Sequence, residues 1–397
     1  MITEKSRRYK LSLFFILYFV QGVLFAYMSL FHKPYLDSQG ISADQIAWLN
    51  VVVLSPFILK ILFGVVSDRI NLFGRGHRLP YIILGIVLSV IAFGTLAFIA
   101  PRDGLLPFGI LLTVFIFSIA LMDSSADGLA VDTTATGDRQ AVQASMLVGR
   151  FGAIIIMALL FGAIAQRMGY TAAFLISAVF LALPLLWVLQ LHEPAERPAE
   201  QAFQWSALKA ILTPAYGVVA LLSLAFGAFV VGVVGIFTFY MSKELGANSD
   251  QVGLYGAINS LGIILGAAVS VPLLRRFPQF RVQMGLFLLW SLVLLVWGIE
   301  PSMGLSFVLG GIAGLIFGMI NTVYLGIAME RTQTQAAGTI FALTMALLNI
   351  GLAVGDAVFT GLTDNIGFGS VFLLQGGLSL LLLLLLWAVQ RTESTTG

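Results

Sequence analysis

The chain has 397 residues, of which 59% are hydrophobic and only 10% are charged, and its formal net charge is +2. Soluble domains are about 45–50% apolar and about 25% charged, so this composition excludes a soluble enzyme and a nucleic-acid-binding protein. The sequence has no cysteine, and its three scattered histidines are too few for a metal cluster. We therefore expect a polytopic membrane protein with no metal and no cofactor.

Twelve segments of the chain are apolar over about 20 residues, the length that a helix needs to cross the hydrocarbon core. The first six lie approximately at Leu11–Phe31, Asp44–Val66, Leu79–Ala100, Leu105–Val131, Gln140–Gln166 and Thr171–Leu191. The other six lie approximately at Pro214–Tyr240, Ser249–Leu274, Val282–Ile299, Ser302–Met329, Ala336–Leu362 and Gly369–Val389. The sequence thus predicts an all-α membrane protein with twelve transmembrane helices.

The basic residues predict the orientation of these spans, because cytoplasmic loops carry an excess of lysine and arginine. With both termini inside, fifteen of the 21 basic residues are cytoplasmic, namely Lys5, Arg7, Arg8, Lys10, Arg69, Arg75, Arg78, Arg139, Arg197, Lys209, Arg275, Arg276, Arg281, Arg331 and Arg391. Four fall in outer loops, namely Lys33, Arg102, Arg167 and Lys243. We expect a multi-pass protein of the plasma (inner) membrane with both termini in the cytoplasm.

A polar stretch between the sixth and seventh spans divides the chain into two parts. His192–Pro214 contains two early prolines and mixed charges, which is typical of a cytoplasmic linker. Its Trp205–Leu212 portion is amphipathic enough to lie on the membrane surface. We place an N-terminal six-helix bundle at residues 1–191, the linker at 192–213 and a C-terminal six-helix bundle at 214–397.

The two parts repeat each other in sequence. Gly40–Gln45 (GISADQ) before the second span matches Gly246–Gln251 (GANSDQ) before the eighth, and both have the spacing of a helix capping box. The fourth and tenth spans also carry polar residues at matching positions, Asp123 and Asn321. Two matches in corresponding places predict two pseudo-symmetric six-helix bundles, an arrangement in which transporters bind substrate near the midplane between the halves.

Ionisable side chains inside the spans are the first candidates for function, because each costs at least about 2.5–3.5 kcal/mol unless it faces a cavity or a partner. They are Lys60, Asp123, Asp127, Arg150 and Asp356. Asp123 and Asp127 are four residues apart and share a helix face. Lys60, Asp123 and Arg150 lie at similar depth, about 12–16 Å from the inner side at 1.5 Å per residue. The two interpretations are a static ion network that holds helices in register and a proton- or substrate-linked site.

Asp356 is the only one of these ionisable residues in the C-terminal part, and no cation lies nearby on its own helix. We interpret it as a coupling or gate residue, the alternative being a carboxylate neutralised by a partner on another helix. Proton coupling is accordingly assigned to Asp123, Asp127 and Asp356.

Amides and aromatic residues predict the substrate contacts. Asn321 and Asn349 occupy the positions that correspond to Asp123 and Arg150, so they keep hydrogen-bonding capacity without charge and would contact polar substrate groups or another helix. A stripe on the first span contains Tyr18, Gln21, Phe25 and Met28, and one on the seventh contains Phe226, Phe229, Val233, Phe237 and Tyr240. Such stripes are usually packing, but the central Gln21 favours a cavity. The predicted substrate-binding residues are Tyr18, Gln21, Phe25, Asp123, Arg150, Phe237, Asn321 and Asn349.

The loop between the second and third spans carries a distinctive motif. It consists of Gly64-Val-Val-Ser-Asp68-Arg69 followed by the basic turn Gly74-Arg75-Gly-His77-Arg78. Gly64 permits close helix approach, Asp68 can meet the positive end of a facing helix, and the arginines can pair with Asp132 at the inner end of the fourth span. The motif resembles the cytoplasmic signature of the major facilitator superfamily. This resemblance implies the major facilitator fold and a cytoplasmic gate formed by Gly64, Asp68, Arg69, Arg75, Arg78 and Asp132.

Longer strings are similar to one branch of that superfamily, the folate–biopterin transporters, muropeptide permeases and related acetyl-CoA and siderophore carriers. These strings are Tyr18–Gly22 (YFVQG), Ser55–Asp68 with its Ser-Pro, Lys60 and Gly64, Gly74–Tyr81 (GRGHRLPY) and Ser125–Asp132 (SADGLAVD). The second-half basic turn, Arg275–Arg281, departs from the motif because it lacks the aspartate. The resemblance implies transport of a sizeable, often anionic organic molecule together with protons.

These observations predict a secondary active transporter, not an enzyme, that works by alternating access and is coupled to protons. The substrates left open are a pterin or folate, a muropeptide, a siderophore or a similar anionic metabolite. We expect the lipid bilayer, the solute and protons as partners, no nucleic acid, and a monomer. The alternative is a non-transporting relative that serves as a membrane assembly factor or chaperone.

Overall fold

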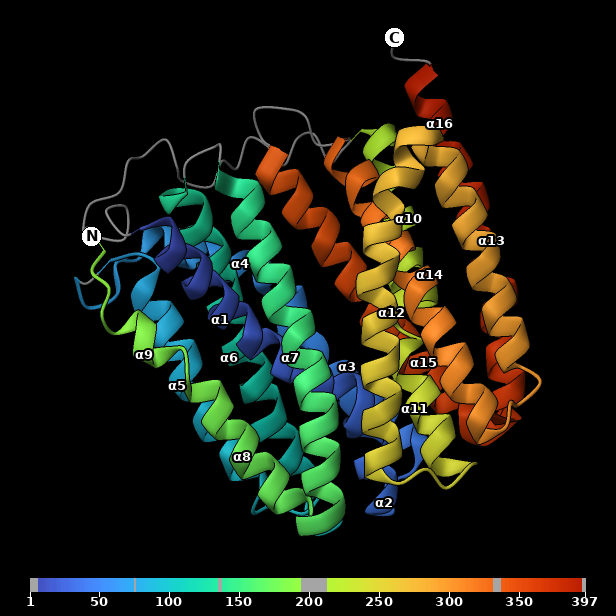
Figure 1. The fold of residues 1–397 in the computed structure, drawn as a ribbon, viewed down its shortest axis with the longest axis horizontal. Coiled ribbons are helices and arrows are strands. Elements are labelled where there is room, and N and C mark those ends of the chain that lie inside the picture. The colour runs from blue at the N-terminus through green and yellow to red at the C-terminus, as the bar shows by residue number, and fades with distance from the viewer. Residues whose placement is uncertain (1–5, 75, 135–137, 194–212, 331–336, 395–397) are drawn as a thin grey trace. The chain divides into compact units, whose positions relative to one another are not determined.

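The computed structural model describes residues 6–74, 76–134, 138–193, 213–330 and 337–394. The regular structure in these ranges is helical, and they contain no strand (Figure 1). Eleven helical segments within them are long and apolar enough to cross a membrane. The predicted linker lies almost entirely outside the described residues, as does Arg75.

The chain forms two compact units. Unit 1 comprises Met1–His32, Val52–Phe203 and Asn248–Leu254, and unit 2 comprises Lys33–Val51, Gln204–Ala247 and Tyr255–Gly397. Two short pieces thus cluster with the part of the chain that is distant in sequence. The predicted domain boundaries at residues 191 and 214 stay a prediction.

The helices of the first half follow the predicted spans with shifted ends. They are α1 Arg7–Ala26, the π-helix η2 Tyr27–Phe31, α2 His32–Ser38, α3 Ala43–Ile58, α4 Lys60–Arg69, the 3₁₀ turn η3 Leu72–Gly74, α5 Leu79–Leu96, α6 Leu105–Thr133, α7 Arg139–Met168, α8 Tyr170–Ala182 and α9 Leu185–Val188. The first helix continues about two turns beyond the predicted end at Phe31. Lys33, which was predicted in an outer loop, therefore lies in a helix. Its side chain is buried, and the carboxylate of Asp356 neutralises its charge.

The second predicted span is two helices instead of one. Pro56 lies inside α3 and cannot donate a backbone hydrogen bond to the preceding turn, and the helix ends two residues later, at Ile58. Leu59 separates α3 from α4, which begins at Lys60. This break places the side chain of Lys60 at the start of a helix in the middle of the predicted span.

In unit 1, α1 packs along α7 and α5 packs along α6. Glycines allow the first contact to be close, since a Cβ on Gly22 would overlap the backbone carbonyl of Arg150 and one on Gly149 would overlap that of Phe15. The approach of the two backbones brings one face of α1 against the middle of α7. That contact positions the polar side chains described below.

The helices of the second half are α10 Pro214–Phe226, the π-helix η7 Gly227–Val231, α11 Val234–Lys243, α12 Ser249–Arg276, α13 Gln279–Trp297, α14 Met303–Glu330, α15 Ala337–Ser379 and α16 Leu381–Ser394. Gly367 has a φ of 78° and a ψ of 160°, so α15 consists of two arms joined at this residue. The first arm covers the predicted eleventh span from Ala337 onward, and the second covers the start of the twelfth. The number of twelve membrane-crossing helices stays a prediction, because one continuous segment of 49 residues covers the last two.

Local features recur at corresponding places in the two halves. Both predicted capping boxes are confirmed: the Ser42 amide donates to the Gln45 side chain at 3.1 Å, and the Asn248 amide donates to that of Gln251 at 3.0 Å, each with the return bond. A glycine of positive φ, 79° and 65° respectively, stands two residues before each box. The first and seventh predicted spans also each contain a five-residue π-helix. These repeats extend the sequence match to backbone geometry.

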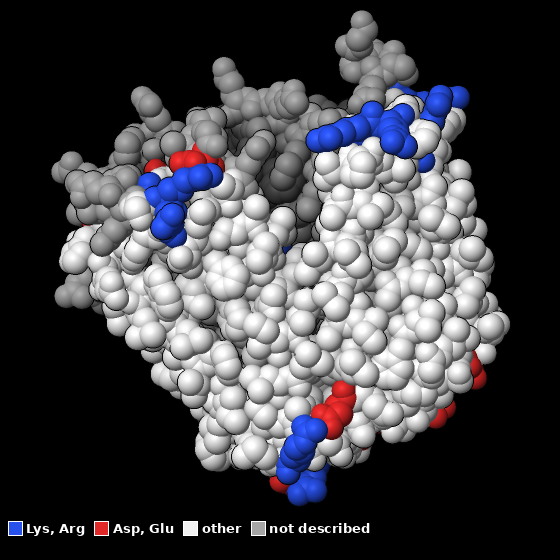
Figure 2. All heavy atoms as spheres, viewed as in Figure 1, with Lys and Arg blue, Asp and Glu red and all other residues white. Residues whose placement is uncertain are grey.

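The surface agrees with a membrane-spanning protein. On the face in Figure 2, most Lys, Arg, Asp and Glu side chains gather near helix ends, and other residue types form the surface between them. Large apolar side chains such as Trp48, Phe98 and Leu106 are exposed. Apolar exposure of this extent is typical of contact with lipid.

Candidate functional site

A buried ion pair lies inside unit 1 where α4 begins. The Lys60 ammonium forms an ion pair with Asp123 of α6 and lies 3.5 Å from Oδ2 of Asp127, one helical turn further along. Asp123 is 1% exposed, whereas Asp127 is 44% exposed. The i, i+4 spacing therefore directs both carboxylates to one lysine, as their shared helix face predicts. Ser124 fixes the start of α4 by donating to the Lys60 carbonyl at 3.2 Å.

Tyr18 connects this ion pair to the arginine of α7. Its hydroxyl donates to Oδ1 of Asp127, and its ring lies 5.0 Å from the guanidinium carbon of Arg150. The same guanidinium lies 5.6 Å from the ring centroid of Phe25. Arg150 is thus held by two aromatic faces, an arrangement that stabilises a cation by about 0.5–2 kcal/mol. No ion pair joins Arg150 to a carboxylate in the described part of the chain.

Several polar atoms of this cluster are buried without a hydrogen-bond partner among the described residues. They are Oε1 of Gln21, Oδ1 of Asp123 and Nε of Arg150. A buried polar group without a partner is destabilising, commonly by about 1–3 kcal/mol, so unpartnered acceptors and donors that gather in one place indicate a site for water or a ligand. We call the set Tyr18, Gln21, Phe25, Lys60, Asp123, Asp127 and Arg150 the ionic cluster.

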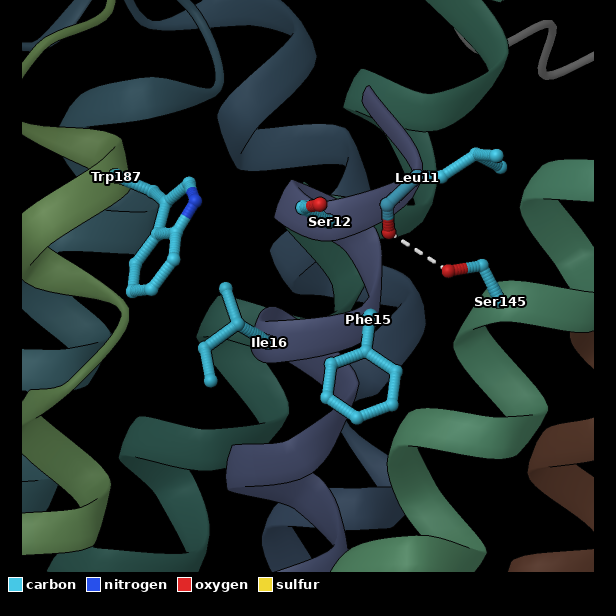
Figure 3. A pocket seen from close by; sticks show the side chains of 6 residues that line it. All are labelled: Leu11, Ser12, Phe15, Ile16, Ser145 and Trp187. Atoms are coloured by element: carbon cyan, nitrogen blue, oxygen red, sulfur yellow. Dashed lines mark hydrogen bonds between the residues drawn. The ribbon is translucent and has the colours of Figure 1, made fainter. Parts of the chain in front are cut away.

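The cavity drawn in Figure 3 is a separate feature of unit 1. It has a volume of about 350 Å³ and is lined by Leu11, Ser12, Phe15, Ile16, Ser145 and Trp187. Within it, the Ser145 hydroxyl donates to the Leu11 carbonyl at 2.7 Å. None of the predicted site residues lines it, and it contains no ionisable side chain.

Arg78 organises the predicted cytoplasmic gate. Its Nε lies 3.3 Å from Oδ2 of Asp132, and its Nη1 donates to the Ser67 hydroxyl at 2.6 Å. The carboxylate of Glu193 accepts from the backbone amides of Arg78 and Leu79 at 2.8 and 2.9 Å, at the start of α5. A carboxylate at this place satisfies helix N-terminal amides and complements the helix dipole. Glu193 was not among the predicted site residues.

The described residues show no close helix approach at Gly64, and its predicted place in the gate stays a prediction. A Cβ at Gly64 would meet nothing within 4 Å, whereas one on Gly128 of α6 would overlap the Arg78 guanidinium. The glycine needed for close approach therefore lies on the helix that faces the arginine. Arg69 ends α4 with an exposed side chain, and the side chain of Asp68 lies outside the described part of the chain, as Arg75 does.

The remaining predicted substrate contacts lie in unit 2. Phe237 of α11 is buried against aromatic rings, 4.6 Å from Trp297 and 5.5 Å from Phe372 between ring centroids, so its predicted role in a binding site is replaced by core packing. Its place in an aromatic stripe is explained by that core. Asn321 of α14 and Asn349 of α15 are half-buried.

Asp356 has a cation on another helix, which is the alternative that the sequence analysis left open without naming the partner. It forms a buried ion pair with Lys33 of α2, and its Oδ2 accepts from the Asn50 side chain of α3 at 2.5 Å. Both partners lie more than 300 residues away in sequence, so spacing along the helix of Asp356 could not identify them. The signal that was present is that Asn50 is a single polar residue within the apolar stretch AWLNVVVL.

Comparison with protein families identifies the fold. The family model of the Major Facilitator Superfamily matches residues 11–355 and again residues 219–397. Among solved structures, that of the nucleoside transporter NupG has a TM-score of 0.76 at 13% identity and covers 97% of this chain and 99% of its own. A bacterial homolog of the human lysosomal transporter Spinster has a TM-score of 0.70 at 14% identity and covers 97% and 96%.

Relatives with assigned names confirm the resemblance predicted from the sequence strings, and all three named here are transporters or permeases. A folate-biopterin transporter of Synechocystis sp. is 28% identical over 386 residues, 88% of this chain and 74% of its own. A putative sugar efflux transporter of Deinococcus radiodurans is 25% identical, over 92% and 94%. An anhydromuropeptide permease of Escherichia coli K12 is 21% identical, over 96% and 80%. The chain is therefore a multi-pass membrane transporter that belongs to the Major Facilitator Superfamily.

Proposed function

We propose that the protein is a proton-coupled secondary transporter of an anionic organic solute, working by alternating access, and that the ionic cluster is where proton and solute bind. The observation that carries this proposal is the guanidinium of Arg150, which is without a carboxylate partner among the described residues. A cation inside the membrane-spanning region favours an anion, and arginine binds carboxylates through its planar fork of donors.

The aromatic rings and the side-chain amide of Gln21 indicate which chemical groups the solute carries. Tyr18 and Phe25 flank the guanidinium, and Phe25 stacks on Phe57 at a centroid distance of 6.2 Å and an interplanar angle of 12°. Flat rings favour stacking with a flat solute. The unpartnered Oε1 of Gln21 adds an acceptor for an N–H group. A pterin that carries a carboxylate has these groups, and the name of the Synechocystis relative supports folate and biopterin as first probes.

Charge neutrality supports the coupling. The cluster holds two cations, Lys60 and Arg150, and two carboxylates, Asp123 and Asp127. An anion that binds Arg150 makes the cluster negative unless a proton enters as well, and uncompensated charge is costly at this depth. Asp127 is the carboxylate we assign to the proton, because it is partly exposed and Asp123 is buried against Lys60. The predicted coupling role of Asp123 then becomes that of a fixed counter-charge.

Purified protein in liposomes tests this proposal with radiolabelled folic acid, which carries carboxylates, and biopterin, which carries none. Asp127→Asn should abolish accumulation driven by a pH gradient while exchange of labelled for unlabelled folic acid continues, and Asp127→Glu should restore accumulation. Arg150→Lys should raise the KM for folic acid at least tenfold and change that for biopterin less. Arg167→Lys, an exposed arginine on the same helix, is the matched control and should leave both unchanged.

Two results would contradict the proposal. Accumulation that continues at the same rate when a protonophore collapses the pH gradient would exclude proton coupling. Equal KM changes for folic acid and biopterin in Arg150→Lys would exclude an anion at Arg150.

A further inference from the structure

The cavity of Figure 3 lies beside the first turns of α1 and is open to the surface of unit 1. Trp187 of α9 stands on one side of the α1 side chains and Ser145 of α7 stands on the other (Figure 3). The α1 side chains between them are Leu11, Ser12, Phe15 and Ile16. The side chain of Ser12 is exposed and that of Trp187 is half-buried. The cavity is therefore a surface groove, with α1 as its floor and α7 and α9 as its walls.

Both walls of this groove belong to an apolar surface. Leu186 of α9 and Val148 of α7 are exposed, although their side chains are apolar. Exposed apolar side chains of this kind are typical of a surface that contacts lipid. The groove thus opens to the bilayer, and a lipid can enter it from the side.

Arg8 stands at the end of the groove where α1 begins. It precedes Ser12 by four residues and Phe15 by seven, so the three residues lie on one face of the helix. At 1.5 Å per residue, Arg8 is about 6 Å from Ser12 along the helix axis. The face of α1 that forms the floor of the groove therefore ends in a cation.

The two neighbours of Arg8 are directed to the walls instead. The Arg7 guanidinium lies 2.9 Å from the carboxylate of Asp138, which precedes α7. The Tyr9 hydroxyl donates to the backbone carbonyl of Trp187 in α9 at 3.0 Å. The side chain of Arg8, between these two contacts, is exposed.

Three kinds of side chain follow one another along the floor of the groove. Arg8 carries a positive charge, the Ser12 hydroxyl can donate a hydrogen bond, and Phe15 and Ile16 are apolar. An anionic phospholipid presents the matching groups in the same order, namely a phosphate, an ester carbonyl and an acyl chain. Basic side chains at the membrane surface attract anionic lipids, and tryptophans such as Trp187 are enriched where the headgroups meet the hydrocarbon.

We propose that this groove is a binding site for one anionic phospholipid of the leaflet in which α1 begins. The phosphate binds Arg8, the Ser12 hydroxyl donates to an ester carbonyl, and an acyl chain lies in the groove beyond them. The volume of about 350 Å³ is within the range of ligand sites, about 300–1,000 Å³, and holds part of one chain. A lipid bound there contacts α1, α7 and α9 together.

This site is separate from the ionic cluster. Tyr18, the first member of the cluster on α1, follows Arg8 by ten residues, which is about 15 Å along the helix. The bound lipid is neither the solute nor a part of proton coupling. The inference therefore does not depend on the proposed function, and its test needs no solute.

The fluorescence of Trp187 tests the site with lipids whose acyl chains carry bromine, which quenches tryptophan on contact. The protein is reconstituted in mixtures of phosphatidylglycerol, which is anionic, and phosphatidylcholine, which has no net charge, with bromine on one of the two lipids at a time. Because the chain has six tryptophans, the signal of Trp187 is taken as the difference between the parent protein and Trp187→Phe. Quenching against mole fraction gives the affinity of one lipid relative to the other at this residue.

We expect phosphatidylglycerol to bind at least about fivefold more tightly than phosphatidylcholine at Trp187, the preference that one basic side chain at a membrane surface provides. Arg8→Gln should remove this preference, and the variant should fold because the side chain of Arg8 is exposed. Lys10→Gln is the matched control. It removes the same charge from the same end of α1, but the Lys10 ammonium donates to the Thr133 carbonyl of α6 at 2.9 Å, so the preference should remain.

Ser12→Phe tests the position of the acyl chain. Because the side chain of Ser12 is exposed, an added ring fills the groove without displacing the core, and quenching of Trp187 by both brominated lipids should fall. Trp48, an exposed residue of α3, is the control tryptophan and is measured in the same way with Trp48→Phe. Its quenching should be the same in the parent protein and in Arg8→Gln.

Three results would overturn the site. Equal quenching of Trp187 by the two lipids in the parent protein would mean that the groove contacts only the bulk lipid around the protein. Equal losses of preference in Arg8→Gln and Lys10→Gln would mean that a general surface charge attracts the lipid. Unchanged quenching in Ser12→Phe would mean that no acyl chain enters the groove.

Discussion

Replacing Lys60 with methionine tests whether the carboxylates of the ionic cluster depend on this lysine. The substitution keeps the length of the side chain and leaves Asp123, which is 1% exposed, without its cation. Removing one partner of a fully buried ion pair costs about 3–5 kcal/mol. Because 28% of the Lys60 side chain is exposed, we expect the lower end of this range, about 3 kcal/mol. For a domain of this size the Tm then falls by about 6–12 °C, at about 2–4 °C per kcal/mol.

The assay is the unfolding midpoint in one detergent, followed by tryptophan fluorescence. Lys243→Met is the matched control, because 28% of its side chain is also exposed but its carboxylate partners are 26% and 32% exposed. Partly hydrated ion pairs contribute about 0–1 kcal/mol to stability, so the Tm of Lys243→Met should fall by at most about 4 °C. Adding Asp123→Asn to Lys60→Met should recover part of the loss, since a neutral amide needs no cation. Equal losses for the two lysines, or no recovery, would refute the reasoning.

Five further substitutions have expected effects that follow from packing or from helix caps. Gly149→Ala should lower the Tm, because its methyl group overlaps a backbone carbonyl of α1, whereas Gly152→Ala on the same helix meets nothing within 4 Å and should raise stability by about 0.5–1 kcal/mol. Ser42→Ala and Asn248→Ala should each cost about 1 kcal/mol in thermal unfolding, and equal stability to the parent would mean that the capping boxes do not form in the membrane. Gly128→Ala should displace the guanidinium at the start of α5, which faster maleimide labelling of a cysteine introduced at Ser67 would report.

Features that depend on neighbours along the chain were predictable. The two capping boxes follow from residues three apart, and the shared lysine of Asp123 and Asp127 follows from a spacing of one helical turn. The depth of a residue within its span could also be predicted, because the rise per residue of a helix is constant. The amino-acid sequence alone therefore places Lys60 level with Asp123.

Features that depend on which helix faces which were not predictable. The partner of Asp356 required the first helix to extend past Lys33, whereas the apolar stretch that predicts the span ends at Phe31. Gly64 was predicted from the motif alone, whereas the contact of Gly128 with Arg78 depends on which helix faces the arginine. Phe25 and Phe237 both belong to aromatic stripes with similar spacing in the first and seventh predicted spans. Their surroundings differ, because Phe237 is buried among other rings and Phe25 lies against Arg150.

The charge balance of the ionic cluster links the two ligands of the proposed transport cycle. The cluster is neutral when empty and again neutral when one carboxylate of the solute and one proton enter together. The cation of the Lys33–Asp356 ion pair in unit 2 has a carboxylate partner, so this pair offers no comparable site for an anion. Asp127→Asn should therefore abolish coupling while Arg150 still binds folic acid. Loss of folic acid binding in Asp127→Asn would show instead that the proton and the solute do not bind at separate groups of the cluster.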